Sequence, residues 1–81
     1  MQVIELKELF EFMIKGIVDF PEKVEINQIV TENTIVFEVK VDQSDVGKVI
    51  GKQGKNIKAI RLIMNAAAQK NDKRAIIEII N

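Results

Sequence analysis

The sequence predicts an α+β domain in which helices cover one face of a three-stranded mixed sheet. Three observations predict this fold class. Apolar residues near the N-terminus recur at helical spacing, two β-like segments follow, and a β-branched segment comes after a long helical stretch. The expected order is α-β-β-α-α-β. Because two helices separate the second strand from the third, we expect these two strands to be parallel.

The first element is an amphipathic helix. Its apolar residues recur at intervals of three and four, whereas charged residues such as Glu8 and Lys15 lie off this stripe. The helix ends before Pro21, because the residue before a proline avoids helical backbone angles. Phe12 lies beside the stripe, as either an ordinary core residue or a contact position for another protein. The stripe consists of Leu6, Leu9, Phe10, Met13, Ile14, Ile17 and Val18.

Two strands follow the first helix and are expected to form a hairpin. Residues 23–31 are rich in Val and Ile, and Glu32 with Asn33 makes a polar break that suits a turn. Residues 35–41 then alternate apolar and polar side chains, which is the clearest strand pattern in the chain. The last strand, residues 75–80, is a β-branched run, and we expect it to be buried on much of both faces.

Two helices are predicted between the second and third strands. Asp42 or Ser44 can cap a short helix that runs to about Ile50. A longer helix begins at Lys55 or Asn56 and is followed by a polar turn. The apolar face of this longer helix consists of Ile57, Ile60, Met64 and Ala67.

The net charge of zero conceals an uneven distribution along the chain. Residues 1–45 carry four lysines and ten acids, a net charge of −6, whereas residues 46–81 carry eight basic residues and two acids, a net charge of +6. The basic residues are densest at Lys48, Lys52, Lys55, Lys58 and Arg61. This stretch is either a surface that faces phosphates or a solvated helix face.

Several functional classes are disfavoured by what the sequence lacks. Without cysteine or histidine there is no disulfide, no thiolate metal site and no imidazole base, so we expect no metal, no cofactor and no enzymatic activity. Asp42 and Asp45 are accounted for as a helix cap and a solvated turn residue. No apolar run approaches the roughly 18 residues of a membrane span, and no secretory pattern is visible, so we expect a cytoplasmic protein without a membrane partner.

The most distinctive motif is the segment between the two predicted helices. Gly51 and Gly54 flank Lys52 and Gln53, and glycines permit both a sharp turn and close approach of a sugar-phosphate backbone. Free N–H groups and the dipole at the start of the second helix favour an anion there. The spacing fits neither a P-loop nor a dinucleotide-binding loop, each of which needs a glycine or hydroxyl residue that is absent here. A plain glycine-rich turn between helices is the alternative interpretation.

The wider pattern resembles the KH domain. Val49 and Ile50 precede the Gly-x-x-Gly motif, and Ile57 and Ile60 follow it at the spacing of the KH core. The element order resembles the type II arrangement, with a helix and a strand added before the shared β-α-α-β unit. The chain is similar to the KhpA family of small bacterial single-KH proteins over residues 6–80. The resemblance implies one KH domain over residues 1–81, with the KH core at about 33–81 and the added helix and strand at 3–31.

This resemblance implies non-catalytic binding of single-stranded RNA, with the loop clamping the RNA backbone. Post-transcriptional regulation or RNA chaperone activity is the implied role. The implied RNA-binding residues are Gly51, Lys52, Gln53, Gly54, Lys48, Lys55, Lys58 and Arg61. All four phenylalanines precede the basic stretch, and Tyr and Trp are absent, so base stacking on exposed aromatic residues is not expected.

A protein–protein interaction module with little RNA affinity is the alternative function. The family resemblance implies two protein partners, a second copy of the chain and a second, larger bacterial KH-domain protein. Phe12 and the apolar last strand are the candidate contact positions, and ordinary core packing is the competing explanation for both.

Overall fold

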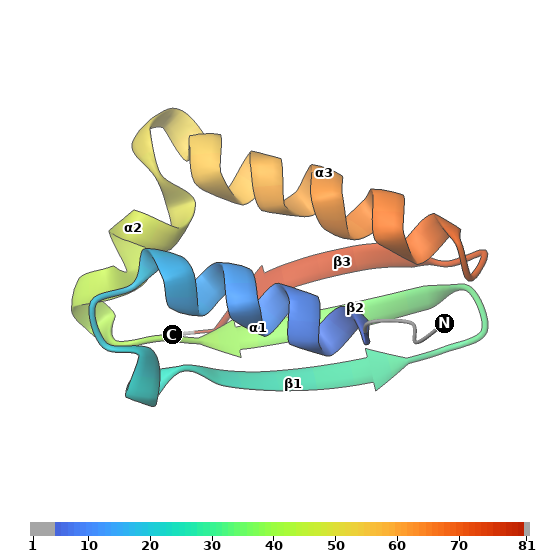
Figure 1. Ribbon diagram of the computed structural model, residues 1–81, viewed down its shortest axis with the longest axis horizontal. Coiled ribbons are helices and arrows are strands. Elements are labelled where there is room, and N and C mark those ends of the chain that lie inside the picture. The colour runs from blue at the N-terminus through green and yellow to red at the C-terminus, as the bar shows by residue number, and fades with distance from the viewer. Residues whose placement is uncertain (1–4, 81) are drawn as a thin grey trace.

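Helices pack on one face of a three-stranded sheet, as expected (Figure 1). The computed structural model describes residues 5–80, so the predicted boundaries at residues 1, 3 and 81 lie outside the described residues. The α-β-β-α-α-β order is confirmed. The elements are α1 (Leu6–Ile17), β1 (Glu25–Val30), β2 (Thr34–Lys40), α2 (Val46–Ile50), α3 (Lys55–Gln69) and β3 (Arg74–Ile79).

Strand β2 is the central strand of the sheet. It pairs with β1 in the antiparallel sense, with Gln28 opposite Phe37, and with β3 in the parallel sense, with Phe37 opposite Ile77. Alternate residues of β2 point to the helices and are buried, because successive side chains of a strand face opposite sides of the sheet. Both the predicted hairpin and the predicted parallel pairing are confirmed.

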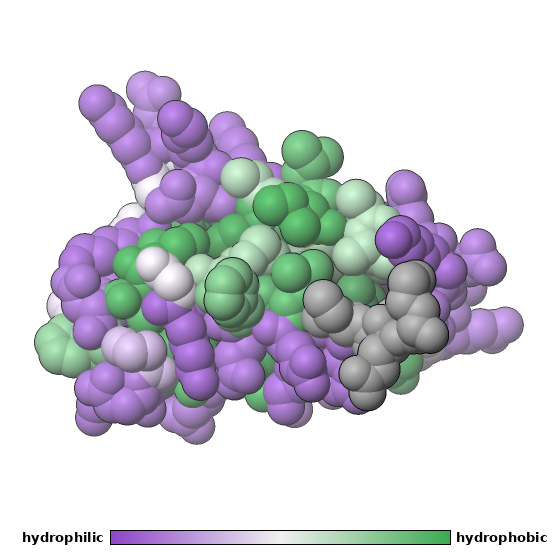
Figure 2. Space-filling view, viewed as in Figure 1, coloured by the Kyte–Doolittle hydropathy of each residue, from purple (hydrophilic) through white to green (hydrophobic). Residues whose placement is uncertain are grey.

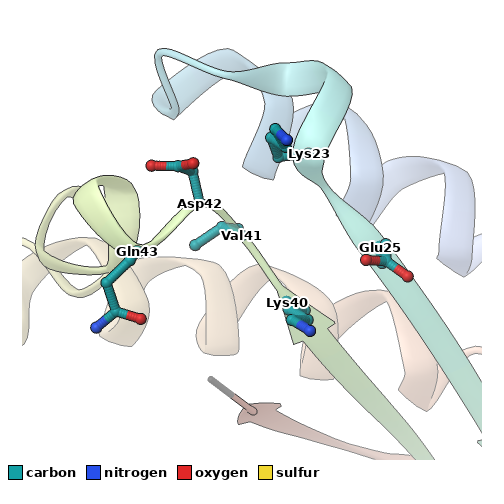
Figure 3. Close-up of a pocket in the computed structure, with 6 residues that line it drawn as sticks. All are labelled: Lys23, Glu25, Lys40, Val41, Asp42 and Gln43. Atoms are coloured by element: carbon teal, nitrogen blue, oxygen red, sulfur yellow. The ribbon is translucent and has the colours of Figure 1, made fainter.

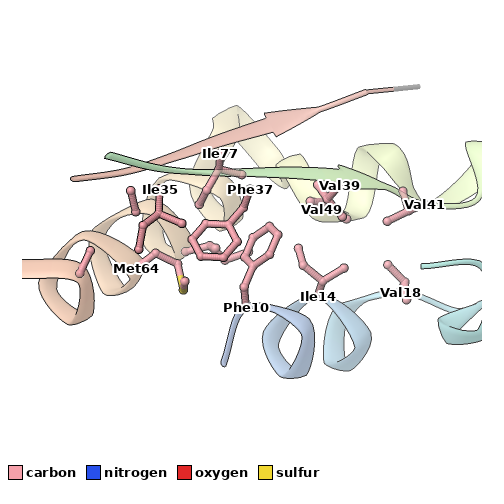
Figure 4. Packing of buried hydrophobic residues seen from close by; sticks show 13 residues of the cluster. Phe10, Ile14, Val18, Ile35, Phe37, Val39, Val41, Val49, Met64 and Ile77 are labelled. Carbon is pink, nitrogen blue, oxygen red and sulfur yellow. The ribbon is translucent and has the colours of Figure 1, made fainter. Parts of the chain in front are cut away.

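The core lies between the sheet and the helices (Figure 4). Phe10 of α1 and Phe37 of β2 meet at its centre, with ring centroids 5.2 Å apart and tilted by 40°, a separation typical of interacting aromatic pairs. The buried apolar residues are Phe10, Ile14, Val18, Ile35, Phe37, Val39, Val41, Val49, Ile60, Met64, Ala68, Ala75 and Ile77. The predicted apolar face of α1 meets the same core as β2, and so does that of α3 except that Ala68 rather than Ala67 is buried. Phe12 is 78% exposed.

The expectation that the last strand is buried on much of both faces is wrong. Strand β3 is an edge strand, and only its helix-facing residues Ala75 and Ile77 are buried, while Ile76 and Ile80 are exposed. A β-branched run is typical of a strand covered on both faces, but none of the elements within residues 5–80 covers the outer face of this sheet. The run of isoleucines therefore indicates a strong tendency to form a strand, and not burial on both faces of the sheet.

The assignment of Asp45 to a solvated turn is also wrong. Its side chain is fully buried, and its two carboxylate oxygens accept hydrogen bonds from the backbone N–H groups of Asp19 and Phe20, each at 3.1 Å. Asp42 does cap the turn that leads into α2, accepting a hydrogen bond from the Ser44 backbone N–H. The loop after α1 is thus tied to the residue that precedes α2.

Among residues 5–80, no helix combines the length and apolar character needed to cross a membrane.

Candidate nucleic-acid interface

The turn between α2 and α3 has a backbone that most residues avoid. Gly51 and Gly54 have φ angles of 78° and 75°, and Gln53 between them has a φ of 58°. Glycine adopts this left-handed region without a Cβ penalty. The Gly51 N–H donates to the Gly47 carbonyl at 2.8 Å, and the Gly54 N–H donates to the Gly51 carbonyl at 3.0 Å. The turn is therefore hydrogen-bonded internally and projects from one end of the molecule (Figure 1).

The two glycines face different surroundings. A Cβ atom on Gly51 would lie 2.7 Å from Cγ of Asn56, so this position has no space for a side chain. A Cβ atom on Gly54 would meet only Lys58 Cε at 3.6 Å and a methyl group of Ile57 at 4.0 Å. Gly51 is thus required by packing within the protein, whereas Gly54 leaves open surface at the start of α3.

A surface hollow beside this turn is lined by Lys52, Gln53, Lys55 and Lys58. All four side chains are exposed, and hydrophilic side chains fan out over this end of the molecule (Figure 2). Lys55, Lys58 and Arg61 recur every three residues on α3, which places them along one side of the helix. Arg61 lies one turn beyond the residues of the hollow.

The cations of the hollow are not neutralised by the protein. Within residues 5–80 the ion pairs are Lys15 with Glu11 and Lys48 with Asp19, so Lys52, Lys55 and Lys58 have no acidic partner. Unpaired, adjacent cations attract an anionic ligand more strongly than paired ones, because the full charge is available.

Lys48 is a predicted site residue whose charge is used within the protein instead. Its ammonium group donates a hydrogen bond to the Asp19 carboxylate, and this bond raises the pKa of Lys48 above its usual value. The pair joins α2 to the loop after α1. Lys48 is therefore not among the residues that line the hollow.

A second hollow, where β1 begins and β2 ends, has mixed charge (Figure 3). Its lysines, Lys23 and Lys40, are balanced by Glu25 and Asp42, and the Asp42 carboxylate already accepts hydrogen bonds from Ser44. It is lined by Lys23, Glu25, Lys40, Val41, Asp42 and Gln43. A hollow with two cations and two anions offers an anionic polymer little net attraction, unlike the one beside the Gly-x-x-Gly turn.

These features define a class of protein. An α-β-β-α-α-β order with β3 parallel to β2 and a left-handed Gly-x-x-Gly turn between two helices is the type II KH fold.

The particular family follows from comparison with known proteins. The chain belongs to the KhpA/KhpB KH-domain family, whose profile matches residues 7–79. It is 49% identical over 75 residues to the RNA-binding protein KhpA of Clostridium perfringens, covering 93% of this chain and 100% of that protein. It is 47% identical to the RNA-binding protein KhpA of Clostridium acetobutylicum over 75 residues, with the same coverage. The RNA-binding protein KhpA of Caldanaerobacter subterraneus is 49% identical over 73 residues, which cover 90% of this chain and 97% of that protein.

Sequence reasoning missed two residues that shape the site. Asn56 donates a hydrogen bond from its side-chain amide to the Lys48 carbonyl at 2.8 Å, and Asp45 binds the loop that carries Asp19. An Asn in the first turn of a helix is typical of a local hydrogen bond, and this signal could have identified Asn56. No sequence signal pairs Asp45 with a loop 25 residues earlier.

Proposed function

We propose that this protein binds single-stranded RNA without catalysis, and that the loop from Gly51 to Gly54 holds the RNA backbone. One observation carries the proposal: lysines with no acidic partner among residues 5–80 line a hollow beside a left-handed glycine turn. A KH loop of this kind grips the backbone of about four nucleotides. Family membership supports the same substrate, since the clostridial relatives are named RNA-binding proteins.

The residues of the loop and helix divide into three roles. Lys52 and Gln53 face the phosphates, and Lys55 and Lys58 flank the path of the strand along α3. Gly54 allows the strand to approach closely, and Arg61 extends the path by one turn. Lys48 contacts RNA only if a phosphate displaces the Asp19 carboxylate from the Lys48 ammonium group.

The wider role that we propose is post-transcriptional regulation or RNA chaperone activity in the cytoplasm, carried by one KH domain over residues 1–81. Charge attraction to phosphates is independent of base sequence. A site built mainly from lysines therefore suits a protein that binds many RNAs with little sequence preference.

The direct test replaces Lys52 and Gln53 together with Asp. Both side chains are exposed, and Asp tolerates the left-handed backbone of residue 53, so we expect the fold to persist. Affinity for an unstructured RNA should fall at least about tenfold, because two carboxylates then face the phosphates. The matched control replaces Gln69 and Lys70 with Asp, which changes the charge equally at the other end of α3. Equal losses in both variants would contradict a clamp at the loop.

Salt dependence provides a second measurement on the wild type. With three or four lysine–phosphate contacts on a single strand, the slope of log affinity against log salt should be about −2 to −3. A flat dependence would mean that the basic face is only solvated.

A second candidate function, self-association, is favoured by a separate observation. Phe12 on α1 and Leu62 and Ile63 on α3 are 78%, 74% and 46% exposed, and apolar side chains gather over these two helices in Figure 2. Exposed apolar surfaces of this kind mark interaction sites. We propose that a second copy covers this face, since a domain this small has few core residues and gains stability by burying more apolar surface.

The dimer test uses neutral substitutions that leave the basic hollow unchanged. Leu62→Gln should shift the wild-type dimer to a monomer in sedimentation at micromolar concentration, while Lys70→Gln just after the same helix should not. A wild type that sediments only as a monomer would exclude the homodimer. Capture of a larger KH-domain protein through the same residues would indicate the mixed complex instead.

A further inference from the structure

Helix α2 is too short to satisfy its own backbone. With five residues, Val46–Ile50, it leaves most of its carbonyl groups without a partner inside the helix. The Gly51 N–H donates a hydrogen bond to the Gly47 carbonyl. The Lys48 carbonyl instead accepts a hydrogen bond from the Asn56 side chain, at 2.8 Å across the Gly-x-x-Gly turn.

Asn56 also occupies the space that Gly51 leaves. The position of a Cβ atom on Gly51 lies within 2.9 Å of Cγ, Cβ and the backbone nitrogen of Asn56. The side chain of Asn56 therefore contacts both ends of the turn: its amide binds the last turn of α2, and its body packs beside the first glycine. The turn between these two contacts contains Lys52 and Gln53, which line the basic hollow.

We propose that Asn56 is a positioning residue for RNA, which joins the end of α2 to the start of α3 and so orders the Gly-x-x-Gly loop before RNA arrives. This inference rests on the proposed RNA-binding function. The Asn56 side-chain amide donates to a carbonyl of the protein itself. Ordering a loop in advance strengthens binding, because less conformational entropy is lost when the ligand is bound.

The test begins with Asn56→Ala, which removes the donor and the Cγ atom that lies beside Gly51, and keeps Cβ. We expect RNA affinity to fall about fivefold, the loss that corresponds to one hydrogen bond. The salt slope should equal that of the wild type, because no phosphate contact is lost. Asn56→Leu, which keeps most of the side-chain shape but has no donor, should also weaken binding and separates the hydrogen bond from the packing.

The matched control is Asn65→Ala on the same helix. Asn65 also donates its side-chain amide to a carbonyl, that of Arg61 at 3.0 Å, and accepts from the Ala75 N–H at 2.9 Å. It is nine residues from Asn56 and joins α3 to β3 rather than to the loop. Replacing Asn65 with alanine should lower the free energy of unfolding. It should leave RNA affinity unchanged at temperatures well below the unfolding transition.

Hydrogen exchange in the free protein gives a readout that does not depend on RNA. The backbone N–H groups of Gly51 and Gly54 are both hydrogen-bonded. If Asn56→Ala loosens the turn, these amide hydrogens should exchange faster in that variant and at the wild-type rate in Asn65→Ala. Unchanged exchange would overturn the positioning role even if the wild type bound no RNA.

Two binding results would also overturn this inference. In the first, Asn56→Ala binds RNA as tightly as the wild type, while the double replacement of Lys52 and Gln53 loses binding. This result would leave the proposed function intact and contradict only the role of Asn56. The other is a shallower salt slope in Asn56→Ala, which would mean that Asn56 contacts a phosphate itself.

Discussion

A single buried carboxylate connects the first helix of the chain to the second. Asp45 accepts the backbone N–H groups of Asp19 and Phe20, and Asp19 in turn binds the ammonium group of Lys48. These contacts hold the loop after α1 against α2, which leads into the Gly-x-x-Gly turn. Removing a carboxylate that accepts from two backbone donors in a buried place leaves those donors unsatisfied, which costs free energy.

We expect Asp45→Ala to destabilise the fold by about 2 to 4 kcal/mol, because two N–H groups lose their acceptor. Urea unfolding at neutral pH measures the change. Asp45→Asn, which keeps one carbonyl oxygen, should lose less. A loss below about 0.5 kcal/mol for the alanine variant, as for an ordinary surface residue, would contradict this role.

Asp42 contributes a pH dependence to stability. Hydrogen bonds from the Ser44 hydroxyl, at 2.6 Å, and from the Ser44 backbone N–H, at 3.1 Å, lower the pKa of Asp42 below its usual value of 3.8. A carboxylate with a depressed folded-state pKa stabilises the fold above its unfolded pKa, and the contribution is lost as the pH falls through the folded pKa.

The corresponding variant is Asp42→Asn, which still caps the turn but does not titrate. The stability advantage of the wild type over this variant should be largest near neutral pH and should shrink as the pH falls below 3.8. Unfolding curves of both proteins from neutral to acidic pH measure it. A difference that does not change with pH would rule out the contribution of Asp42.

At the scale of single elements, α2 combines a short length with a glycine in its interior. A Cβ atom on Gly47 would meet nothing within 4 Å, so packing inside the protein does not require this glycine. Glycine within a helix costs about 1 kcal/mol relative to alanine. Gly47 is thus unfavourable for stability and lies open to solvent beside the loop. A nucleotide that passes over α2 would explain why glycine is found there.

We therefore expect Gly47→Ala to raise the free energy of unfolding slightly and to lower RNA affinity, because a methyl group then stands in the path of the strand. Thermal unfolding and RNA titration of the same preparation measure the two effects. Gly16→Ala on α1, which also meets nothing within 4 Å, is the control for stability alone. Equal RNA affinity in wild type and Gly47→Ala would exclude a strand over this helix.

The helices and strands could be predicted from local patterns, and the wrong predictions about burial have a shared cause. The periodicity of Phe10 and Ile14, and the alternation through Phe37 and Val39, correctly predicted α1 and β2. The burial of Asp45 and the exposure of Ile76 depend on which element lies opposite, which a local pattern does not contain. Sequence patterns therefore predicted where strands occur but not that β3 has one open face.

At the scale of the whole molecule, the loop and the basic helix were predictable because they are contiguous in sequence. Lys52, Lys55 and Lys58 line one hollow as their spacing suggests. The position of Lys48 was not predictable, because its partner Asp19 is 29 residues away and comes from the loop after α1. The apolar face was predictable only in part: Phe12 was a candidate contact position, whereas Leu62, which lies on another helix, was not.

The measurement that tests the central claim most directly is an NMR titration of the isotope-labelled protein with a short unstructured RNA. The account predicts that the largest shift changes occur at the amides of residues 51–58, with little change in β1. Shift changes centred on the residues around Phe12 and Leu62, or no shift changes at a large molar excess of RNA, would contradict a clamp formed by the Gly-x-x-Gly loop.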